Sequence, residues 1–157
     1  MSDLDRLIAA LPHRPDLAEL MSEFVPPARF SDKRFENYAP AHPTQAAARD
    51  RLQTLAAELN RPSRGEGLLA RLRRNRRRPA PGRGVYLDGG FGVGKTHLLA
   101  ALWHAAPAPK AYLTFDELVH FIGLVGIEPA RRAFSQQRLA AIDEWELDDP
   151  GNLKLAL

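Results

Sequence analysis

One short stretch, Gly89-Gly90-Phe91-Gly92-Val93-Gly94-Lys95-Thr96, constrains the fold of this chain more than any other feature. Its glycine, lysine and threonine have the spacing G-x-x-x-x-G-K-T. Residues 84–88 before it are β-branched, aromatic and aliphatic, which predicts a strand. Residues 97–103 after it are rich in alanine and leucine, which predicts a helix. Strand, glycine loop and helix in this order are the context in which the spacing forms a phosphate-binding loop, the P-loop.

The residue types of this loop fit a magnesium nucleotide. Glycines let the backbone turn so that its N–H groups form a nest for phosphate oxygens. A helix beginning near Gly94 adds free N–H groups and the positive end of its dipole. The spacing places the Lys95 ammonium at the β- and γ-phosphates and the Thr96 hydroxyl on Mg²⁺. We predict an ATP site formed by Gly89, Gly90, Phe91, Gly92, Val93, Gly94, Lys95, Thr96 and His97. His97 either touches water beside the phosphates or occupies an ordinary helix position.

A second acidic element follows downstream. Residues 139–142 are an apolar run that predicts a strand, and Asp143-Glu144 ends it as in a Walker B segment. Beside a P-loop, Asp143 is placed to hold Mg²⁺ through water. We predict that Glu144 polarises the attacking water and, together with Lys95, is catalytic. Trp145 and the acidic residues Glu146, Asp148 and Asp149 are expected in an exposed loop.

The remaining pattern predicts an α/β fold, a P-loop NTPase with a mainly parallel sheet flanked by helices. Apolar stripes predict helices over 4–11 and 16–24, a long helix over 43–59, a strand over 111–115 and a helix capped by Asp116. Arg131 and Arg132 lie in a polar stretch before the last strand. We divide the chain into a helical extension (1–62), a basic linker (63–83) and the first part of an ATPase core (84–157).

The segment 29–38 has no helical or strand period, although its aromatic residues are spaced along it. Prolines follow it, so it is expected to be an ordered loop. Two roles for Phe30, Phe35 and Tyr38 stay open. They dock the segment on the core, or some of them line a pocket for adenine and ribose.

Composition excludes several classes of protein. The 157 residues suffice for about one domain, and the absence of cysteine excludes disulfides and thiolate metal sites. No apolar run reaches the ~20 residues of a membrane span, and the acidic start does not resemble a signal peptide. We therefore expect a cytoplasmic protein.

The basic run from Arg71 to Arg78 has three interpretations. It is a solvated segment, or it contacts anionic lipid, or it contacts nucleic-acid phosphate. No aromatic residue alternates with these arginines, which argues against base stacking and against nucleic acid as a partner.

Residues 84–99, 112–120 and 142–145 together resemble the ZapE cell-division ATPases of the AAA+ class, in particular their actinobacterial branch. The segment 34–40 resembles the part of that family that precedes its first long helix. The resemblance implies that Phe35, Asn37 and Tyr38 lie near the adenine. It also implies a homo-oligomer that uses ATP to remodel a division-ring or other protein partner at the cytoplasmic face of the inner membrane.

This chain departs from the family in length. Family members are much longer, so we expect this sequence to be the amino-terminal portion of a larger protein. The sensor-one strand, the arginine finger and the lid would lie beyond Leu157, and the strands of the P-loop and of Walker B would then lack their shared neighbour. Two other functions stay open: a helicase-loader-like ATPase that contacts DNA through 71–78, and an interaction module without turnover.

Overall fold

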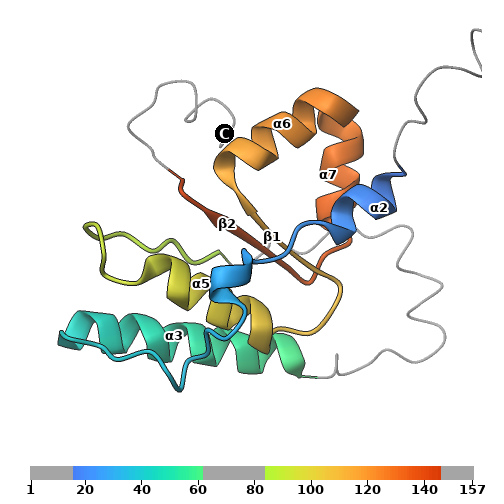
Figure 1. The fold of residues 1–157 in the computed structure, drawn as a ribbon. Coiled ribbons are helices and arrows are strands. Elements are labelled where there is room, and N and C mark those ends of the chain that lie inside the picture. The colour runs from blue at the N-terminus through green and yellow to red at the C-terminus, as the bar shows by residue number, and fades with distance from the viewer. Residues whose placement is uncertain (1–15, 62–83, 146–157) are drawn as a thin grey trace, which may run out of the picture.

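The computed structural model describes residues 16–61 and 84–145. The predicted helix 4–11, the basic run 71–78 and the acidic residues 146–149 lie outside these ranges. The described part contains a two-stranded parallel sheet, with α5 and α3 on one side and α6 and α7 on the other (Figure 1). In chain order the elements are α2 (Leu17–Ser22), the 3₁₀ turn η1 (Ala28–Phe30), α3 (Pro43–Asn60), α5 (Lys95–Ala105), β1 (Lys110–Thr114), α6 (Phe115–Val125), α7 (Ile127–Ser135) and β2 (Leu139–Asp143).

The two strands have a register that aligns their carboxyl ends. Lys110 lies opposite Leu139, and Thr114 lies opposite Asp143. The crossover between the strands contains α6 and α7, as parallel pairing requires. On the other edge of β1, the backbone N–H of Tyr112 donates to the carbonyl of Phe24 at 2.8 Å. The predicted parallel strands near 111–115 and 139–142 are therefore confirmed.

The predicted strand at 84–88 is wrong for the described part of the chain, in which this segment has no strand assignment. Its side chains still alternate between the core and solvent, because Val85 and Leu87 pack against the core while Tyr86 is 58% exposed. A strand needs a backbone ladder as well as an alternating pattern. Within the described residues the sheet consists of β1 and β2, and the segment 84–88 is not part of its ladder.

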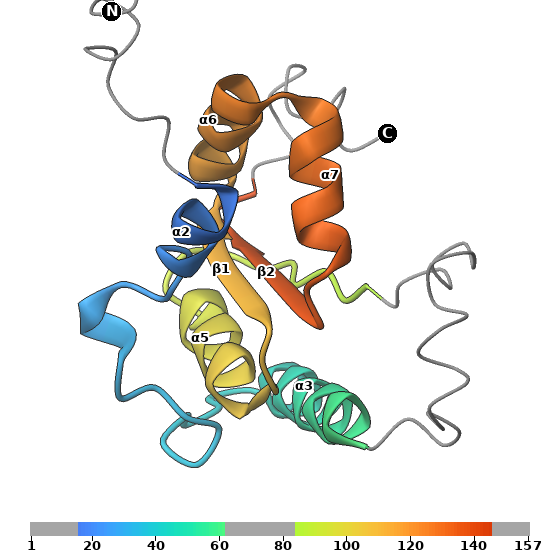
Figure 2. The same ribbon diagram turned by 90° about the vertical axis from the view of Figure 1, so that its right-hand side faces the viewer.

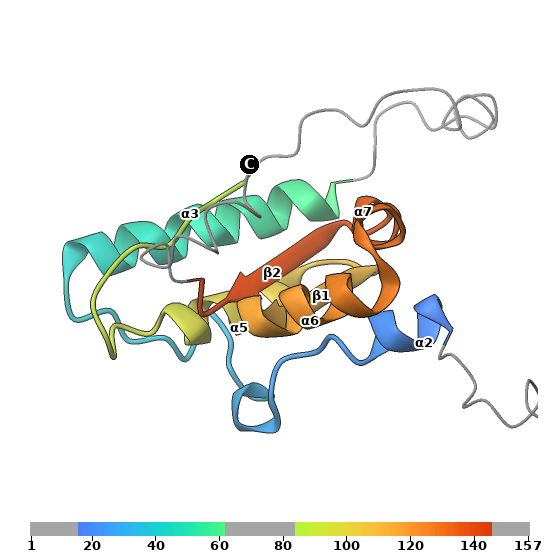
Figure 3. The same cartoon turned by 90° about the horizontal axis from the view of Figure 1, so that it is seen from above.

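Helix α5 is buried on two sides. Leu98, Ala101 and Leu102 pack against α3 through Leu52 and Leu55. Ala100 of α5 packs against the sheet through Tyr112 and Ala141. The alanines at 100 and 101 are fully buried, so α5 lies closely between α3 and the strands. Figure 3 shows this arrangement from above, with α3 and α6 on opposite sides of the strands.

The start of α3 has a clear cause in its sequence. The side chain of His42 accepts from Thr44 N–H, Gln45 completes a capping box, and Pro43 occupies the first turn. These features confirm the predicted long helix.

The cap of α6 differs from the prediction. Thr114 is the N-cap, and its hydroxyl accepts from Glu117 N–H, while the Glu117 side chain returns to the Thr114 backbone. Asp116 lies in the first turn instead, where a carboxylate is favourable to the helix dipole.

Helix α7 is an element that the sequence interpretation missed. Its buried positions are Ala130 and Ala133, too small to stand out in a stretch dominated by charge. Glu128 pairs with Arg131 and Arg132 on the exposed side. Phe24, Phe121 and Phe134 join α7 and α6 to the segment after α2, with ring centroids 5.2 to 6.2 Å apart. Figure 2 shows α2, α6 and α7 gathered over the strands.

Among the helices of 16–61 and 84–145, none has both the length and the apolar character needed to cross a membrane.

Candidate functional site

The glycine-rich segment closes around its own lysine. Lys95 Nζ donates to the carbonyl oxygens of Gly89 and Gly90 at 2.5 and 3.0 Å. Asp88 Oδ1 accepts from the N–H of Gly89 at 2.7 Å. Gly92 and Gly94 have φ values of 74° and 89°, which only glycine adopts readily. The segment therefore forms a tight turn that leads directly into α5.

The first turn of α5 concentrates positive potential. Gly94 is the N-cap and has no side chain to accept from the first N–H groups. Lys95 adds a full positive charge in this turn, where the helix dipole already disfavours cations. In the preceding glycine-rich segment, Phe91 is completely exposed. An arrangement of free amides and an ammonium group is complementary to a phosphate chain.

Asp143 ends β2 with a buried carboxylate, which is 7% exposed. Its Oδ2 accepts from the hydroxyl of Tyr112 at 2.7 Å, and its Oδ1 accepts from Glu144 N–H at 3.0 Å. Burial, followed by the hydrogen bond to Asp143, raises the pKa of Tyr112 above its ordinary value. The tyrosine therefore stays a protonated donor.

The side of the sheet on which Asp143 lies follows from the period of the strand. Ala141, two residues earlier, packs with Ala100 of α5, so Asp143 projects to the same face. Figures 1 and 3 both show the carboxyl end of β2 and the amino end of α5 on the same side of the molecule. The carboxylate and the glycine-rich segment thus share one end of the α5–β2 pair.

Glu144 has a strained backbone. Its φ is 55°, the only positive value for a non-glycine residue in the described part of the chain. Its side chain is exposed. Strain of this kind often accompanies function, and no pattern in the sequence pointed to it.

An open pocket of about 300 Å³ lies between the start of α3 and the glycine-rich segment. Tyr38 contributes to its wall, and the hydroxyl of Tyr38 donates to the carbonyl of Val93 at 2.8 Å. The side chain of Leu98 and the ammonium-bearing Lys95 also line it. The pocket is therefore continuous with the predicted phosphate-binding residues.

A family model described as AFG1-like ATPase matches residues 24–156. The chain belongs to the AFG1-like ATPase family. The match contains the loop 29–38, the glycine-rich segment and both strands, and it supports the sequence resemblance to AAA+ ATPases of this type. A search of curated proteins found no match, and a search of solved structures also found none.

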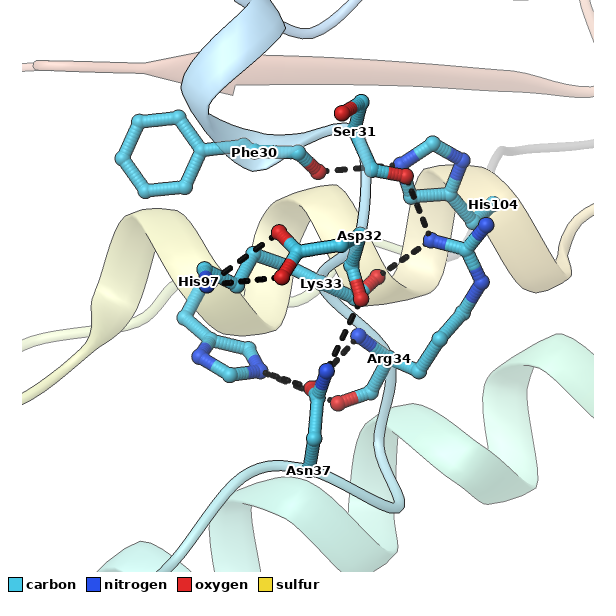
Figure 4. Close-up of polar contacts among 8 residues, drawn as sticks. All are labelled: Phe30, Ser31, Asp32, Lys33, Arg34, Asn37, His97 and His104. Carbon is cyan, nitrogen blue, oxygen red and sulfur yellow. Dashed lines mark hydrogen bonds and ion pairs between the residues drawn. The ribbon is translucent and has the colours of Figure 1, made fainter.

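In this AFG1-like ATPase, two histidines of α5 hold the loop that precedes α3 (Figure 4). His97 Nε2 lies 3.0 Å from the Arg34 carbonyl and 2.9 Å from Asn37 Oδ1. Asn37 Oδ1 already accepts from Arg34 N–H, so both partners of His97 are acceptors and Nε2 must carry the proton. Two turns later, His104 Nε2 lies 3.1 Å from the Phe30 carbonyl.

The three loop residues that the resemblance places near adenine differ from one another in their contacts. Phe35 is buried with Leu52 and Leu55 in the core. The Asn37 side chain donates to the carbonyl of Asp32 and accepts from Arg34 N–H, so it shapes the loop. Tyr38 is the member of this group that lines the pocket. The loop is therefore docked on the core through Phe35, while Tyr38 both docks and faces the candidate site.

Proposed function

We propose that this member of the AFG1-like ATPase family binds ATP with Mg²⁺ and, in its full-length form, hydrolyses it. The observation that carries the proposal is the shared location of two elements. The uncapped, lysine-bearing first turn of α5 and the buried carboxylate of Asp143 lie at the same end of α5 and β2. Amides and ammonium are suited to phosphates, and a carboxylate at the same end of these elements is suited to the accompanying cation.

The donor set fits a nucleotide. Free N–H groups of the first turn and of the loop, with Lys95, would hold the β- and γ-phosphates. A side chain added at Gly90 or Gly92 would meet no other atom within 4 Å, so the loop leaves room for close backbone approach there. Lys95 would exchange the carbonyls of Gly89 and Gly90 for phosphate oxygens. The pocket beside Tyr38 would take the base or the ribose.

Three side chains would bind the metal and activate the water. Mg²⁺ is commonly held by one or two carboxylates together with substrate phosphates, and Thr96 and Asp143 supply a hydroxyl and a carboxylate for this purpose. Bound there, the cation neutralises charge that develops on the phosphates. Glu144 follows Asp143 directly and would accept a proton from the attacking water.

The biological role that we propose is the one implied by the sequence resemblance. ATP turnover in the full-length, oligomeric protein would remodel a protein partner of the cell-division machinery in the cytoplasm, beside the inner membrane. The arginine finger and sensor residues of such a motor would be supplied by sequence outside the described residues.

Two substitutions in the full-length protein test the chemistry. Lys95→Ala is expected to abolish ATP binding, because the ammonium is the principal cation of the site. Glu144→Gln is expected to bind ATP but to lose turnover. The matched controls, Lys33→Ala and Glu36→Gln, change a half-buried and an exposed residue of the preceding loop and should have the binding and turnover of wild type. Unchanged hydrolysis in Lys95→Ala or Glu144→Gln would refute the role assigned to that residue.

A further inference from the structure

Tyr112 is the buried group that the proposed chemistry leaves unused. Its side chain is 2% exposed and lies in the cluster that joins the sheet to α5. The hydroxyl donates to Asp143 Oδ2 at 2.7 Å. Both residues are buried, so this hydrogen bond lies in a medium where a misplaced carboxylate would find few other partners.

The register of the sheet explains how the contact forms. Tyr112 lies opposite Ala141, and Thr114 lies opposite Asp143. Tyr112 therefore reaches two residues toward the carboxyl end of the neighbouring strand, over the small side chain of Ala141. Alternation along each strand puts these side chains on the same face, beneath α5.

We propose that Tyr112 is a positioning residue for the magnesium-binding carboxylate. This inference rests on the proposed function, because it gives Asp143 the metal role. The Tyr112 hydroxyl donates to Oδ2 and the N–H of Glu144 donates to Oδ1, so both oxygens of the carboxylate are held in place. Partners of this kind typically contribute about 10- to 100-fold to the metal affinity of a ligand.

The first experiment measures magnesium-dependent binding of fluorescently labelled ADP to the full-length protein. Tyr112→Phe keeps the ring in the core and removes the hydroxyl. We expect its affinity for ADP in EDTA to match wild type, and its Mg²⁺ midpoint to rise by about 10-fold. Tyr86→Phe removes a hydroxyl from an exposed tyrosine and should leave both values unchanged. An unchanged Mg²⁺ midpoint in Tyr112→Phe would overturn the inference.

A third variant distinguishes the metal-binding role of Asp143 from the positioning role of Tyr112. Asp143→Asn should raise the Mg²⁺ midpoint if the metal assignment is right. If Asp143→Asn raises it and Tyr112→Phe does not, the positioning role is wrong while the proposed site stands. If neither variant changes it, the metal assignment itself fails, and the positioning role fails with it.

A second measurement needs no loss of the hydroxyl and decides the question if Tyr112→Phe does not fold. 3-Fluorotyrosine at position 112 reports on the phenol through its ¹⁹F resonance. Adding Mg²⁺ to the ADP-bound protein should shift this resonance and leave that of 3-fluorotyrosine at position 86 in place. An unmoved resonance at 112 under saturating Mg²⁺ would overturn the inference.

Discussion

The ring of Tyr38 occupies the space that a side chain at position 94 would need. A Cβ built on Gly94 would lie 2.6 Å from Cε2 of Tyr38 and 3.5 Å from its hydroxyl oxygen. The same hydroxyl donates to the carbonyl of Val93, the residue before Gly94. The loop before α3 thus packs directly on the turn that starts α5, and a glycine at 94 is required for two independent reasons.

Gly94→Ala should therefore be costly. The left-handed backbone at φ 89° and the overlap with Tyr38 add together, and we expect the free energy of unfolding to fall by about 2–4 kcal/mol. Urea denaturation measures this loss. Gly90→Ala is the matched control in the same segment, since a Cβ there meets nothing within 4 Å. Equal stability of the two variants would show that Tyr38 and the turn yield without cost.

His97→Phe should loosen the loop 31–38. The variant keeps an aromatic ring against Tyr38, whose centroid lies 5.2 Å from that of His97, but it loses the hydrogen bonds to Arg34 and Asn37. We expect a loss of about 0.5–1.5 kcal/mol in stability and faster hydrogen exchange in the loop. His120→Phe changes an exposed histidine of α6 and should leave exchange in the loop as in wild type. If His97→Phe exchanges no faster, the histidine does not hold the loop.

Lys110→Met should weaken the end of α5. Lys110 Nζ donates to the carbonyls of Trp103 and Ala106 at 2.6 and 2.8 Å and lies 4.2 Å from the ring centroid of Trp103. Methionine fills similar space but leaves carbonyls at the end of α5 without this donor. We expect the free energy of unfolding to fall by about 1–3 kcal/mol. Thermal and urea unfolding measure the loss. Lys33→Met removes a surface ion pair with Asp32 and should lower the free energy of unfolding only slightly, because water screens exposed ion pairs. A larger loss in Lys33→Met than in Lys110→Met would contradict this account.

Stability should decline below neutral pH partly through His104. Burial is the first cause that lowers the pKa of His104, and it outweighs the opposing hydrogen bond to Phe30. The unfolded chain, with a histidine pKa near 6.5, then binds a proton more readily than the folded chain. The contribution of His104 is therefore complete above about pH 6.5 and is lost as the pH falls below it.

The test compares unfolding free energies at pH 7.5 and 5.5. His104→Gln, which retains a side-chain N–H donor, should show a smaller difference between the two values than wild type does. His120→Gln should behave like wild type, because His120 is exposed on α6. If the unfolding free energy of His104→Gln differs between the two pH values as much as that of wild type, His104 has no role in the pH dependence of stability.

Sequence patterns predicted the elements whose signals are local. The long helix α3, the alanine- and leucine-rich α5, and the apolar runs of β1 and β2 all have the expected type. Helix α7 was missed because its buried face consists of alanines. The strand at 84–88 was wrong because pairing depends on a neighbouring strand, which no local pattern contains.

The sequence proposed the residues of the candidate site but not the contacts that those residues make. The spacing of the glycine-rich segment selected Lys95 and Thr96, and the end of an apolar run selected Asp143 and Glu144. The partners of Asp143 and His97 come from residues distant in sequence, namely Tyr112 and the loop at 34–37. These contacts depend on strand register and on loop docking, which only the folded chain fixes.

The double burial of α5 has a consequence for how this sequence can vary. Ala100 faces the strands and Ala101 faces α3, and both have zero exposure. A larger residue at either position would overlap a neighbouring layer. A larger residue at position 100 should be tolerated only with a smaller residue at position 112 or 141. A larger residue at position 101 should be tolerated only with a smaller residue at position 52 or 55.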